Sequence, residues 1–215
     1  MKGLKYESNR IKTRVFKSKH NDLLVDIYED ESLVPYQNER FVKAIDKFIE
    51  LYGDQEVEIY SGAGRSEVSG NHTDHQHGCV LAASINLDAI GIVAPQENVI
   101  KVLSDDFDIR PIYSDDLDKK EEEIGTSEGL IRGVVAKLKE MGYKVGGFKA
   151  FITSDVLMGA GLSSSDTFET IIGTIQTFVE NDHVAAYKEG IEKVFGEGSC
   201  HVLKVRKYGG YKVLG

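Results

Sequence analysis

The stretch between Tyr60 and Val80 concentrates polar side chains that could recognise a small molecule. It reads YSGAGRSEVSGNHTDHQHGCV, and apolar runs typical of strands lie on both sides of it. Arg65, His72 and Asp74 offer the donors and acceptors that the hydroxyls of a polyhydroxylated ligand require, and an arginine can also stabilise charge on oxygen. The pattern therefore predicts a binding loop held between two strands.

Two other interpretations of this stretch remain open. The first is a solvated, turn-rich loop, which the glycines at 62, 64, 70 and 78 would favour. The second is a metal site, because His72, Asp74, His75 and His77 are residue types that bind zinc. Neither a cysteine pair at metal-ligand spacing nor an HExxH helix accompanies them, so the metal site rests on these four side chains alone.

The order of residues in this stretch resembles the amino-terminal signature of galactokinases, members of the superfamily that includes homoserine, mevalonate and phosphomevalonate kinases. GxGR is followed after six residues by HTD, then by a glycine and VLAASI. By resemblance, Arg65 is the catalytic arginine, and Asn71, His72 and Asp74 hold the hydroxyls of galactose. Two positions depart from the usual pattern: Ala63 stands where many galactokinases have proline, and Asn71 where they usually have glutamate.

A glycine- and serine-rich segment forms a second candidate site. Its glycines free the backbone to curl, and a helix beginning around Leu162 would point backbone N–H groups and its dipole at an anion. Alone, such a segment is often only a turn. However, GAGLSSS resembles the ATP-binding loop of the same kinases and follows the sugar signature in the family's order. The resemblance assigns ATP binding to Gly159, Ala160, Gly161, Leu162, Ser163, Ser164 and Ser165, with Mg²⁺ on the Ser164 hydroxyl.

The chain departs from the family after the serines. Asp166 stands where galactokinases usually have alanine, and it could favour the first turn of a helix, repel ATP or share its Mg²⁺. In the family a long segment then supplies the catalytic aspartate, whereas here GTIQTFV follows almost at once and resembles a strand near the family's C-terminal end. The resemblance implies an internal deletion between about Phe168 and Gly173. It divides the chain into a galactokinase-like N-terminal domain, 1–172, and a remnant of the C-terminal domain, 173–215.

The elements that must position these motifs follow from periodicity and turn residues. Helices are predicted over 38–52 with Gly53 as cap, from Thr126 to Met141, from about Leu162, and over 184–195. Strands are predicted at 15–18, 23–29, 56–60, 79–95, 98–104 and 147–153, with a terminal hairpin of 200–206 and 211–214. This mixture indicates an α+β fold. The resemblance makes it the galactokinase-superfamily fold, with a ribosomal-protein-S5-like N-terminal domain and a shortened C-terminal part.

Composition limits the partners. The 215 residues carry a formal net charge of −9, which argues against nucleic acid, because phosphate backbones are held by an excess of Lys and Arg. No run of about eighteen apolar residues predicts a membrane span, and the N-terminus lacks the apolar segment of a signal peptide. Cys79 and Cys200 lie outside any CxxC pair, which fits two buried thiols in a reduced cytoplasm. The oligomeric state does not follow from the sequence.

The resemblance implies phosphorylation of the galactose 1-hydroxyl by ATP with Mg²⁺. Such catalysis consists mainly of positioning and charge stabilisation, with a base oriented to the attacking hydroxyl. Because the aspartate base is not identifiable, we expect impaired activity. The alternatives are a non-catalytic remnant that binds sugar or nucleotide, including the product of a gene with an internal deletion, and a metal-binding module built on the histidine cluster.

Overall fold

A computed structural model describes residues 6–7, 21–69, 79, 81–105, 109–156, 164–177 and 211–214. Its strands are β1 (Tyr6–Glu7), β2 (Glu56–Ser69), β3 (Leu81–Gln96), β4 (Val99–Ser104), β5 (Ile112–Tyr113), β6 (Gly147–Ser154) and β7 (Tyr211–Leu214). Its helices are α2 (Asn21–Tyr28), α3 (Val34–Tyr52), α4 (Ser127–Glu140) and α5 (Ser164–Thr177), with short 3-10 turns η1 (Glu31–Leu33) and η3 (Glu121–Glu123).

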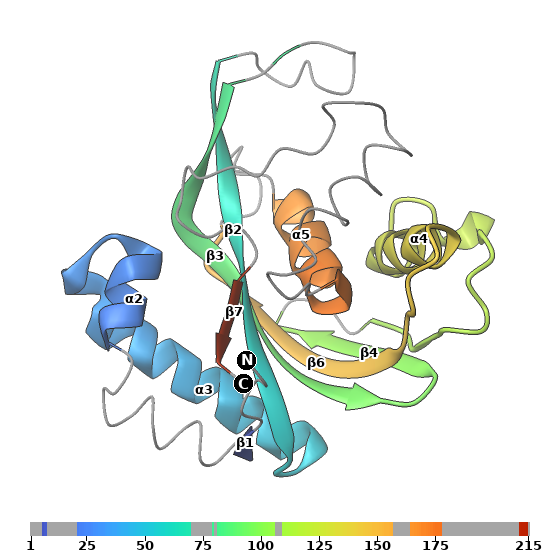
Figure 1. The fold of residues 1–215 in the computed structure, drawn as a ribbon, viewed down its shortest axis with the longest axis horizontal. Coiled ribbons are helices and arrows are strands. Elements are labelled where there is room, and N and C mark those ends of the chain that lie inside the picture. The colour runs from blue at the N-terminus through green and yellow to red at the C-terminus, as the bar shows by residue number, and fades with distance from the viewer. Residues whose placement is uncertain are drawn as a thin grey trace.

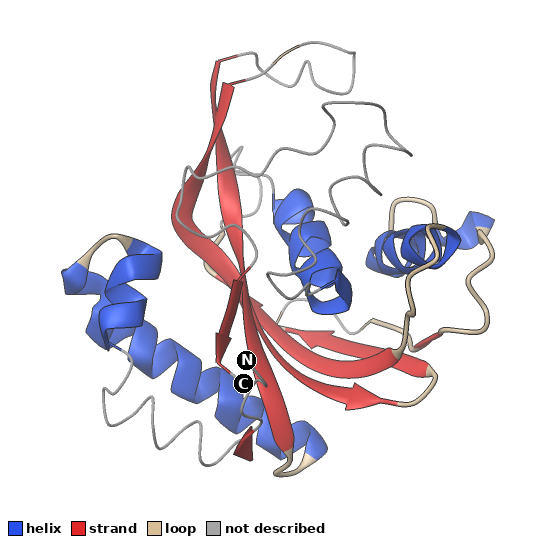
Figure 2. Cartoon of the chain, viewed as in Figure 1, coloured by secondary structure: helices blue, strands red, loops and turns tan. Residues whose placement is uncertain are grey.

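The strands form one seven-stranded sheet in the order β1-β2-β3-β6-β4-β5, and β7 also pairs with β2. The pair β4 and β6 is parallel, whereas the other described pairs are antiparallel. Helices α2 and α3 lie on one face of the sheet, and α4 and α5 lie on the other (Figures 1 and 2). This layered mixture of helices and a mostly antiparallel sheet confirms the α+β class.

Both faces of the central strands are therefore buried. On β2, Ile59 packs in the core under α2 and α3, while its neighbour Tyr60 packs in the core under α4 and α5. On β3, Ile92 and Val93 divide in the same way between the two cores. Successive side chains of a strand point to opposite faces, so the part of a strand that is covered on both sides carries apolar residues at consecutive positions.

Helix α3 confirms the predicted helix over 38–52 and begins earlier, at Val34. Pro35 stands in its first turn, where a missing backbone N–H costs nothing. Phe41, Ile45 and Phe48 recur on one face and are buried. Gly53 caps the helix with φ 77°, a conformation that favours glycine, and its N–H donates to the carbonyl of Ile49.

Helix α4 confirms the predicted helix that starts after Thr126. The Thr126 side chain accepts a hydrogen bond from the Gly129 N–H at 3.2 Å. This bond satisfies one of the first backbone N–H groups, which have no acceptor within the helix. Ile131, Val135 and Leu138 form the buried face. The predicted strands near 98–104 and 147–153 are likewise confirmed as β4 and β6.

Three predicted elements differ from the structure. Residues 23–29 fall mainly in helix α2 and not in a strand, because Leu24, Ile27 and Tyr28 form one buried helical face. Strand β2 does not end at residue 60 but continues to Ser69, since β3 is long enough to pair with all of it. The segment from 173 to 177 belongs to α5 and not to a strand.

Cys79, expected to be buried, is exposed. The other expected thiol, Cys200, lies outside the described residues, as do the predicted strands at 15–18 and 200–206 and the predicted helix at 184–195. Strand β7, predicted as half of a terminal hairpin, pairs with β2: its Tyr211 lies opposite Ser61.

Candidate functional site

Gly64, the residue before Arg65, lies against Val156, which is two residues past the end of β6. A Cβ placed on Gly64 would lie 3.1 Å from the Leu87 carbonyl oxygen and 3.1 Å from Cγ2 of Val156. Glycine therefore allows the close approach of strand β2 to this point. Val156 precedes the glycine- and serine-rich segment in the sequence, so β2, the strand that carries Arg65, lies against the described residue that leads into that segment.

Gly62 provides the second close approach, to helix α5. A Cβ there would lie 3.1 Å from Cβ of Ile171 and 3.3 Å from the Thr167 carbonyl oxygen. Thr167 belongs to the first turn of α5, which begins at Ser164. The resemblance assigns phosphate binding to the start of α5. The first turn of this helix therefore packs against β2, the strand that carries Arg65.

Arg65 follows an irregularity in the pairing of β2 and β3. Ala63 lies opposite Asp88, but Arg65 lies opposite Ser84, so β3 has additional residues at this point. Such bulges bend and twist a strand and occur often beside functional sites. Arg65 was predicted at the start of a loop, but it lies within β2, half-buried, because the pairing resumes after the irregularity.

The other predicted site residues are described only in part. Asn71, His72 and Asp74 lie outside the described residues, as do the segment 159–163 and the histidines of the proposed metal cluster. Ser164 and Ser165 open helix α5, and Asp166 follows in its first turn. In the described part of the chain, no three His, Cys, Asp or Glu side chains are grouped to hold a metal ion.

A buried polar network, which sequence reasoning missed, lies beside this site. Asp88 is 0% exposed, and its carboxylate accepts hydrogen bonds from the Tyr28 hydroxyl at 2.9 Å and from the Ser61 hydroxyl. Arg40 Nη1 donates to the same carboxylate at 2.6 Å. Burial opposes the charge on Arg40, but the carboxylates of Asp88 and Asp155 outweigh it, so the pKa of Arg40 is raised above its usual value.

Two signals in the sequence pointed to this network. Asp88 is the one acidic residue in the apolar run that forms β3, and Arg40 falls on the apolar face of α3 between Gln37 and Phe41. A charged residue at a core position is rarely buried unless it is paired. Each signal could have predicted a buried partner, although neither identifies it.

Asp155, which precedes the glycine- and serine-rich segment, belongs to the same network. It accepts a hydrogen bond from the Tyr36 hydroxyl at 3.0 Å, and its carboxylate lies 3.2 Å from Arg40 Nη1. Burial raises the pKa of Tyr36, and the hydrogen bond to Asp155 raises it further. These contacts turn the Asp155 side chain toward α3, away from the face of the sheet on which α5 lies.

Comparisons with known proteins agree on one family. The galactokinase galactose-binding signature matches residues 46–95. Galactokinases of Lactococcus lactis subsp. lactis and Ligilactobacillus salivarius are 33% identical over 134 residues and 34% identical over 157 residues. The crystal structure of Lactococcus lactis galactokinase complexed with galactose superposes with a TM-score of 0.56 at 28% identity, covering 72% of this chain and 42% of that one. The chain is a relative of the galactokinases.

The relationship covers only part of those proteins. The matches span 60% and 68% of this chain but 34% and 40% of the Lactococcus and Ligilactobacillus galactokinases. The chain therefore spans about two-fifths or less of the length of these relatives. The match to the galactose-binding signature contains Arg65 together with the bulge beside it.

Two cavities lie near the galactokinase-like sheet. One of about 360 Å³ lies between α3 and β6 and includes Arg40, Lys43, Thr153 and Asp155 in its lining.

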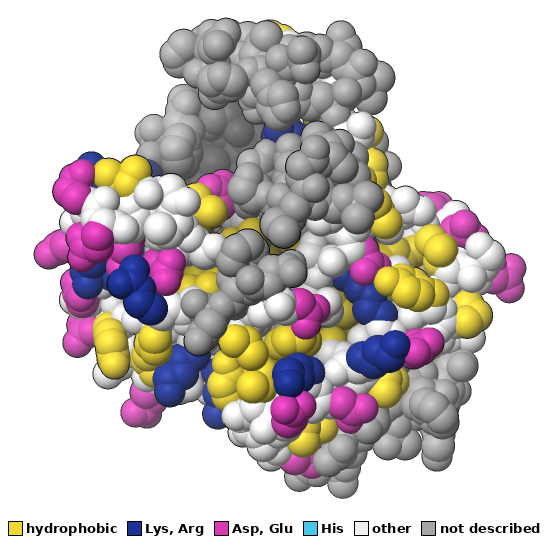
Figure 3. Space-filling view, turned by 180° about the vertical axis from the view of Figure 1, so that it is seen from behind, with side chains coloured by type: hydrophobic (Ala, Val, Ile, Leu, Met, Phe, Trp, Pro, Cys, Tyr) yellow, Lys and Arg dark blue, Asp and Glu magenta, His cyan; other side chains and the backbone are white. Residues whose placement is uncertain are grey.

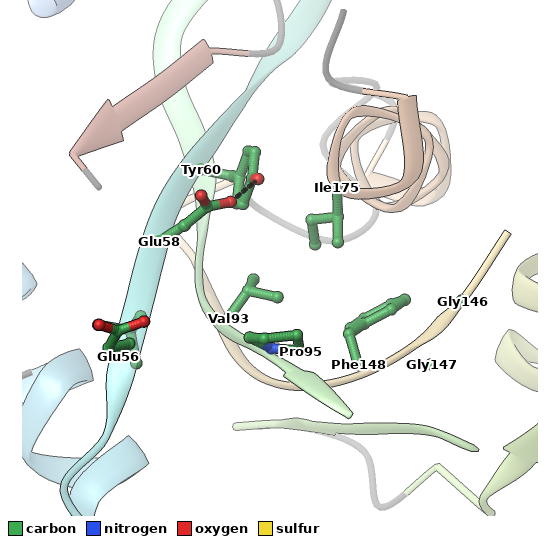
Figure 4. A pocket seen from close by; sticks show the side chains of 10 residues that line it. Glu56, Glu58, Tyr60, Val93, Pro95, Gly146, Gly147, Phe148 and Ile175 are labelled. Atoms are coloured by element: carbon green, nitrogen blue, oxygen red, sulfur yellow. Dashed lines mark hydrogen bonds between the residues drawn. The ribbon is translucent and has the colours of Figure 1, made fainter. Parts of the chain in front are cut away.

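The other cavity, of about 180 Å³, lies at the opposite end of β2 from Arg65. Here Val93, Pro95 and Phe148 face Ile175 of α5 (Figure 4). The Tyr60 hydroxyl donates to Glu58 beside this second cavity, and burial raises the pKa of Tyr60.

Charged side chains of both signs share one face of the molecule. On the face drawn in Figure 3, Lys and Arg side chains are interspersed with Asp and Glu and do not gather into one basic patch. Nucleic-acid binding would require such a patch. Among the described helices, none is both long and apolar enough to cross a membrane.

Proposed function

We propose that this chain is a sugar kinase of the galactokinase type, with galactose as acceptor and ATP with Mg²⁺ as donor, acting in the cytoplasm. The observation that carries the proposal is the match of residues 46–95 to the galactose-binding signature. The contacts of Gly62 and Gly64 support it, because they hold the Arg65 strand against α5 and the end of β6. Sugar and phosphate donor would thus be bound side by side, as phosphoryl transfer requires.

In this proposal each motif has one role. Arg65 stabilises negative charge that develops on oxygen during transfer. Asn71, His72 and Asp74 hold the sugar hydroxyls, because together they supply both donors and acceptors. The residues from Gly159 to Ser165 surround the phosphates. The start of α5 at Ser164 supports this role, because the first N–H groups of a helix and its dipole favour anions.

Magnesium would be held by the Ser164 hydroxyl together with ATP. Oxygen ligands at a phosphate site suit Mg²⁺, which keeps several of its waters and takes few ligands from the protein. The ion, when bound, neutralises charge on the phosphates. The chain's own contribution is to orient the sugar hydroxyl and the phosphates toward one another.

The domain division at 172 and the internal deletion remain parts of this proposal. The family resemblance predicts that the segment missing between about Phe168 and Gly173 would have supplied the aspartate base. Without it, the chain would bind its substrates and turn them over slowly, because general-base help is worth about 10²–10⁴-fold in rate.

Galactose binding tests the sugar site. Isothermal titration calorimetry of the parent should show galactose binding, and Asp74→Ala should weaken it by about 1–3 kcal/mol, the cost of leaving buried hydroxyls without a partner. Asp105→Ala, at an exposed aspartate just after β4, is the matched control and should bind as the parent does. Equal affinity of the Asp74 variant and the parent would overturn this assignment.

Nucleotide binding tests the second site. Gly161→Val places a branched side chain where the backbone must approach phosphate, so we expect it to lose affinity for a fluorescent ATP analogue. Gly133→Val is the control, since a Cβ at this exposed helical glycine meets nothing within 4 Å. Unchanged nucleotide affinity in the Gly161 variant would place the phosphate site elsewhere.

A non-catalytic sugar- or nucleotide-binding protein is the second candidate. The feature that favours it is the internal deletion that the family resemblance predicts, because GTIQTFV follows the serines almost at once. A coupled assay with galactose and ATP, run beside the two binding experiments, separates the candidates. Binding of both ligands without turnover would select the non-catalytic function.

A further inference from the structure

Asp155 is held in place immediately after β6 ends. The last ladder pair between β3 and β6 joins Ala89 to Ser154. One residue later, the Asp155 N–H donates to the carbonyl oxygen of Asp88 at 3.0 Å. The Asp155 carboxylate accepts from the Tyr36 hydroxyl at 3.0 Å and lies 3.2 Å from Arg40 Nη1. The backbone and side chain of Asp155 are thus both fixed at the start of the glycine- and serine-rich segment.

Arg40 connects this point to the rest of the sheet. Its Nη1 lies 2.6 Å from the Asp88 carboxylate, and its Nη2 donates to the Asp88 carbonyl at 2.8 Å and to the Thr153 carbonyl at 3.3 Å. A guanidinium carries several donors in a rigid plane, so it can hold several acceptors in fixed relative positions. Helix α3 therefore contacts both β3 and the end of β6 through one side chain.

The other end of the network reaches the strand that carries Arg65. Ser61 of β2 donates to the Asp88 carboxylate, close to the last regular pair before the bulge, Ala63 opposite Asp88. Since Asp88 is 0% exposed and Arg40 7% exposed, water competes little for these hydrogen bonds. One buried network thus joins the two chain segments that lead into the candidate sugar and phosphate sites.

We propose that Arg40 is a positioning residue for the glycine- and serine-rich segment, acting through Asp155 and through the carbonyls of Thr153 and Asp88. The proposal rests on the proposed function, because that segment is assigned to the phosphates of ATP. In this proposal Arg40 acts through these groups and sets where the segment begins relative to β2. Placement of this kind matters because a shift of about 1 Å in a bound group can cost about 10²-fold in rate.

A purely structural role for Arg40 makes a different prediction. If Arg40 only neutralised Asp88, breaking its contact with Asp155 would change little beyond stability. Asp155→Ala therefore distinguishes the two roles, since it removes the contact with Asp155 and leaves the pair of Arg40 and Asp88 intact. Arg40→Lys complements it: the lysine keeps a cation opposite Asp88 but cannot reproduce the fork that reaches both carbonyls.

Glu123→Gln is the matched control. Glu123 is 7% exposed and forms a comparable buried pair with Arg132, 2.6 Å from Nε, but this pair ties η3 to α4. For the parent and the three variants, we would measure the affinity for a fluorescent ATP analogue with Mg²⁺ and the affinity for galactose by calorimetry. Hydrogen exchange of the backbone amides of residues 153–165 provides a third measurement that requires no ligand.

We expect Asp155→Ala and Arg40→Lys to lower the affinity for the ATP analogue by about 10-fold or more. The affinity for galactose should stay within about twofold of the parent's. The amides of 153–165 should exchange faster in both variants, whereas the control should change only thermal stability. Parental nucleotide affinity and parental exchange in both variants would overturn the proposal. A parent that binds neither ligand would overturn the proposed function, and the exchange measurement would then decide the anchoring role alone.

Discussion

Arg40 and Asp88 form an ion pair at 2.6 Å, with only 6% and 0% of their side chains exposed. The two residues come from α3 and β3, so the pair crosses from the helical layer into the sheet. A buried carboxylate is costly unless it is paired and hydrogen-bonded, and Asp88 meets both conditions through Arg40, Tyr28 and Ser61. The pair is thus a structural requirement of the fold as well as a link to the candidate site.

Removing one partner of this pair should be more harmful than removing both. Arg40→Met leaves the Asp88 carboxylate buried without its cation, and we expect a loss of about 3–5 kcal/mol in the free energy of unfolding, measured in urea. The double variant Arg40→Met with Asp88→Leu should recover part of that loss, because no uncompensated charge remains. A double variant less stable than the single one would contradict this account.

Gly64 should tolerate no side chain. In Gly64→Ala the new Cβ would lie 3.1 Å from the backbone carbonyl of Leu87, which has little freedom to move. We expect a loss of about 1–3 kcal/mol in thermal or urea unfolding, together with weaker galactose binding, because Arg65 is the next residue. Gly133→Ala is the control: with nothing within 4 Å in a helix interior, it should gain about 0.5–1 kcal/mol. Equal stability of the two variants would contradict the close packing at Gly64.

The buried pair of Glu123 and Arg132 should make stability depend on pH. Hydrogen bonds from Arg132 lower the pKa of Glu123 below its usual value. The unfolded chain then binds more protons in the interval between the two pKa values. The stabilisation is therefore full above about pH 4.3, the ordinary pKa of a glutamate, and is lost as the pH falls through the lowered pKa.

Glu123→Gln checks this prediction. At pH 7 the variant should be less stable than the parent by about 1.5–3 kcal/mol, the usual worth of a hydrogen bond to a charged group. At pH 3 the difference should be smaller, since the parent's glutamate is then partly protonated. A difference that stays constant from pH 7 to pH 3 would show that the charge of Glu123 does not matter.

Much of the fold could be predicted from the sequence because its signals are local. Thr126 and Gly142 mark the ends of α4 within a few residues, and the apolar spacing in α3 is unambiguous. The prediction of a strand at 23–29 was wrong because a short apolar run fits both the helical and the strand periodicity. The packing of Leu24 and Ile27 against the core favours the helix.

The candidate site could be predicted only as two separate motifs. The approach of the Arg65 strand to the chain that leads into the second motif depends on Gly64 meeting Val156, two residues far apart in the sequence. The network was missed for the same reason, since Arg40 and Asp88 are 48 positions apart and each pattern shows only one member. The bulge beside Arg65 likewise depends on which residues of β3 lie opposite β2, which no local pattern records.

Turnover should be very slow in the chain as it stands. The family resemblance leaves the aspartate base unidentified, and Asp155 and Asp166 are the nearest aspartates that could replace it. Asp155 is not suited to this role, because it bonds to Tyr36 and Arg40 on the α3 side of the sheet. Asp166 lies in the first turn of α5 and directly follows the residues assigned to the phosphates, not those assigned to the sugar. Loss of general-base help costs about 10²–10⁴-fold, so a coupled assay should find activity near its detection limit.

The intact Lactococcus lactis galactokinase, assayed in parallel, serves as the positive control for that measurement. Asp166→Asn, which keeps the size of the side chain and removes its charge, should not lower the residual rate, because Asp166 is not expected to act as the base. Turnover on the order of 1–100 s⁻¹, ordinary for kinases, would instead mean that another residue of this chain accepts the proton. An Asp166→Asn variant with far lower turnover than the parent, but with the parent's affinity for ATP and Mg²⁺, would identify that residue as Asp166.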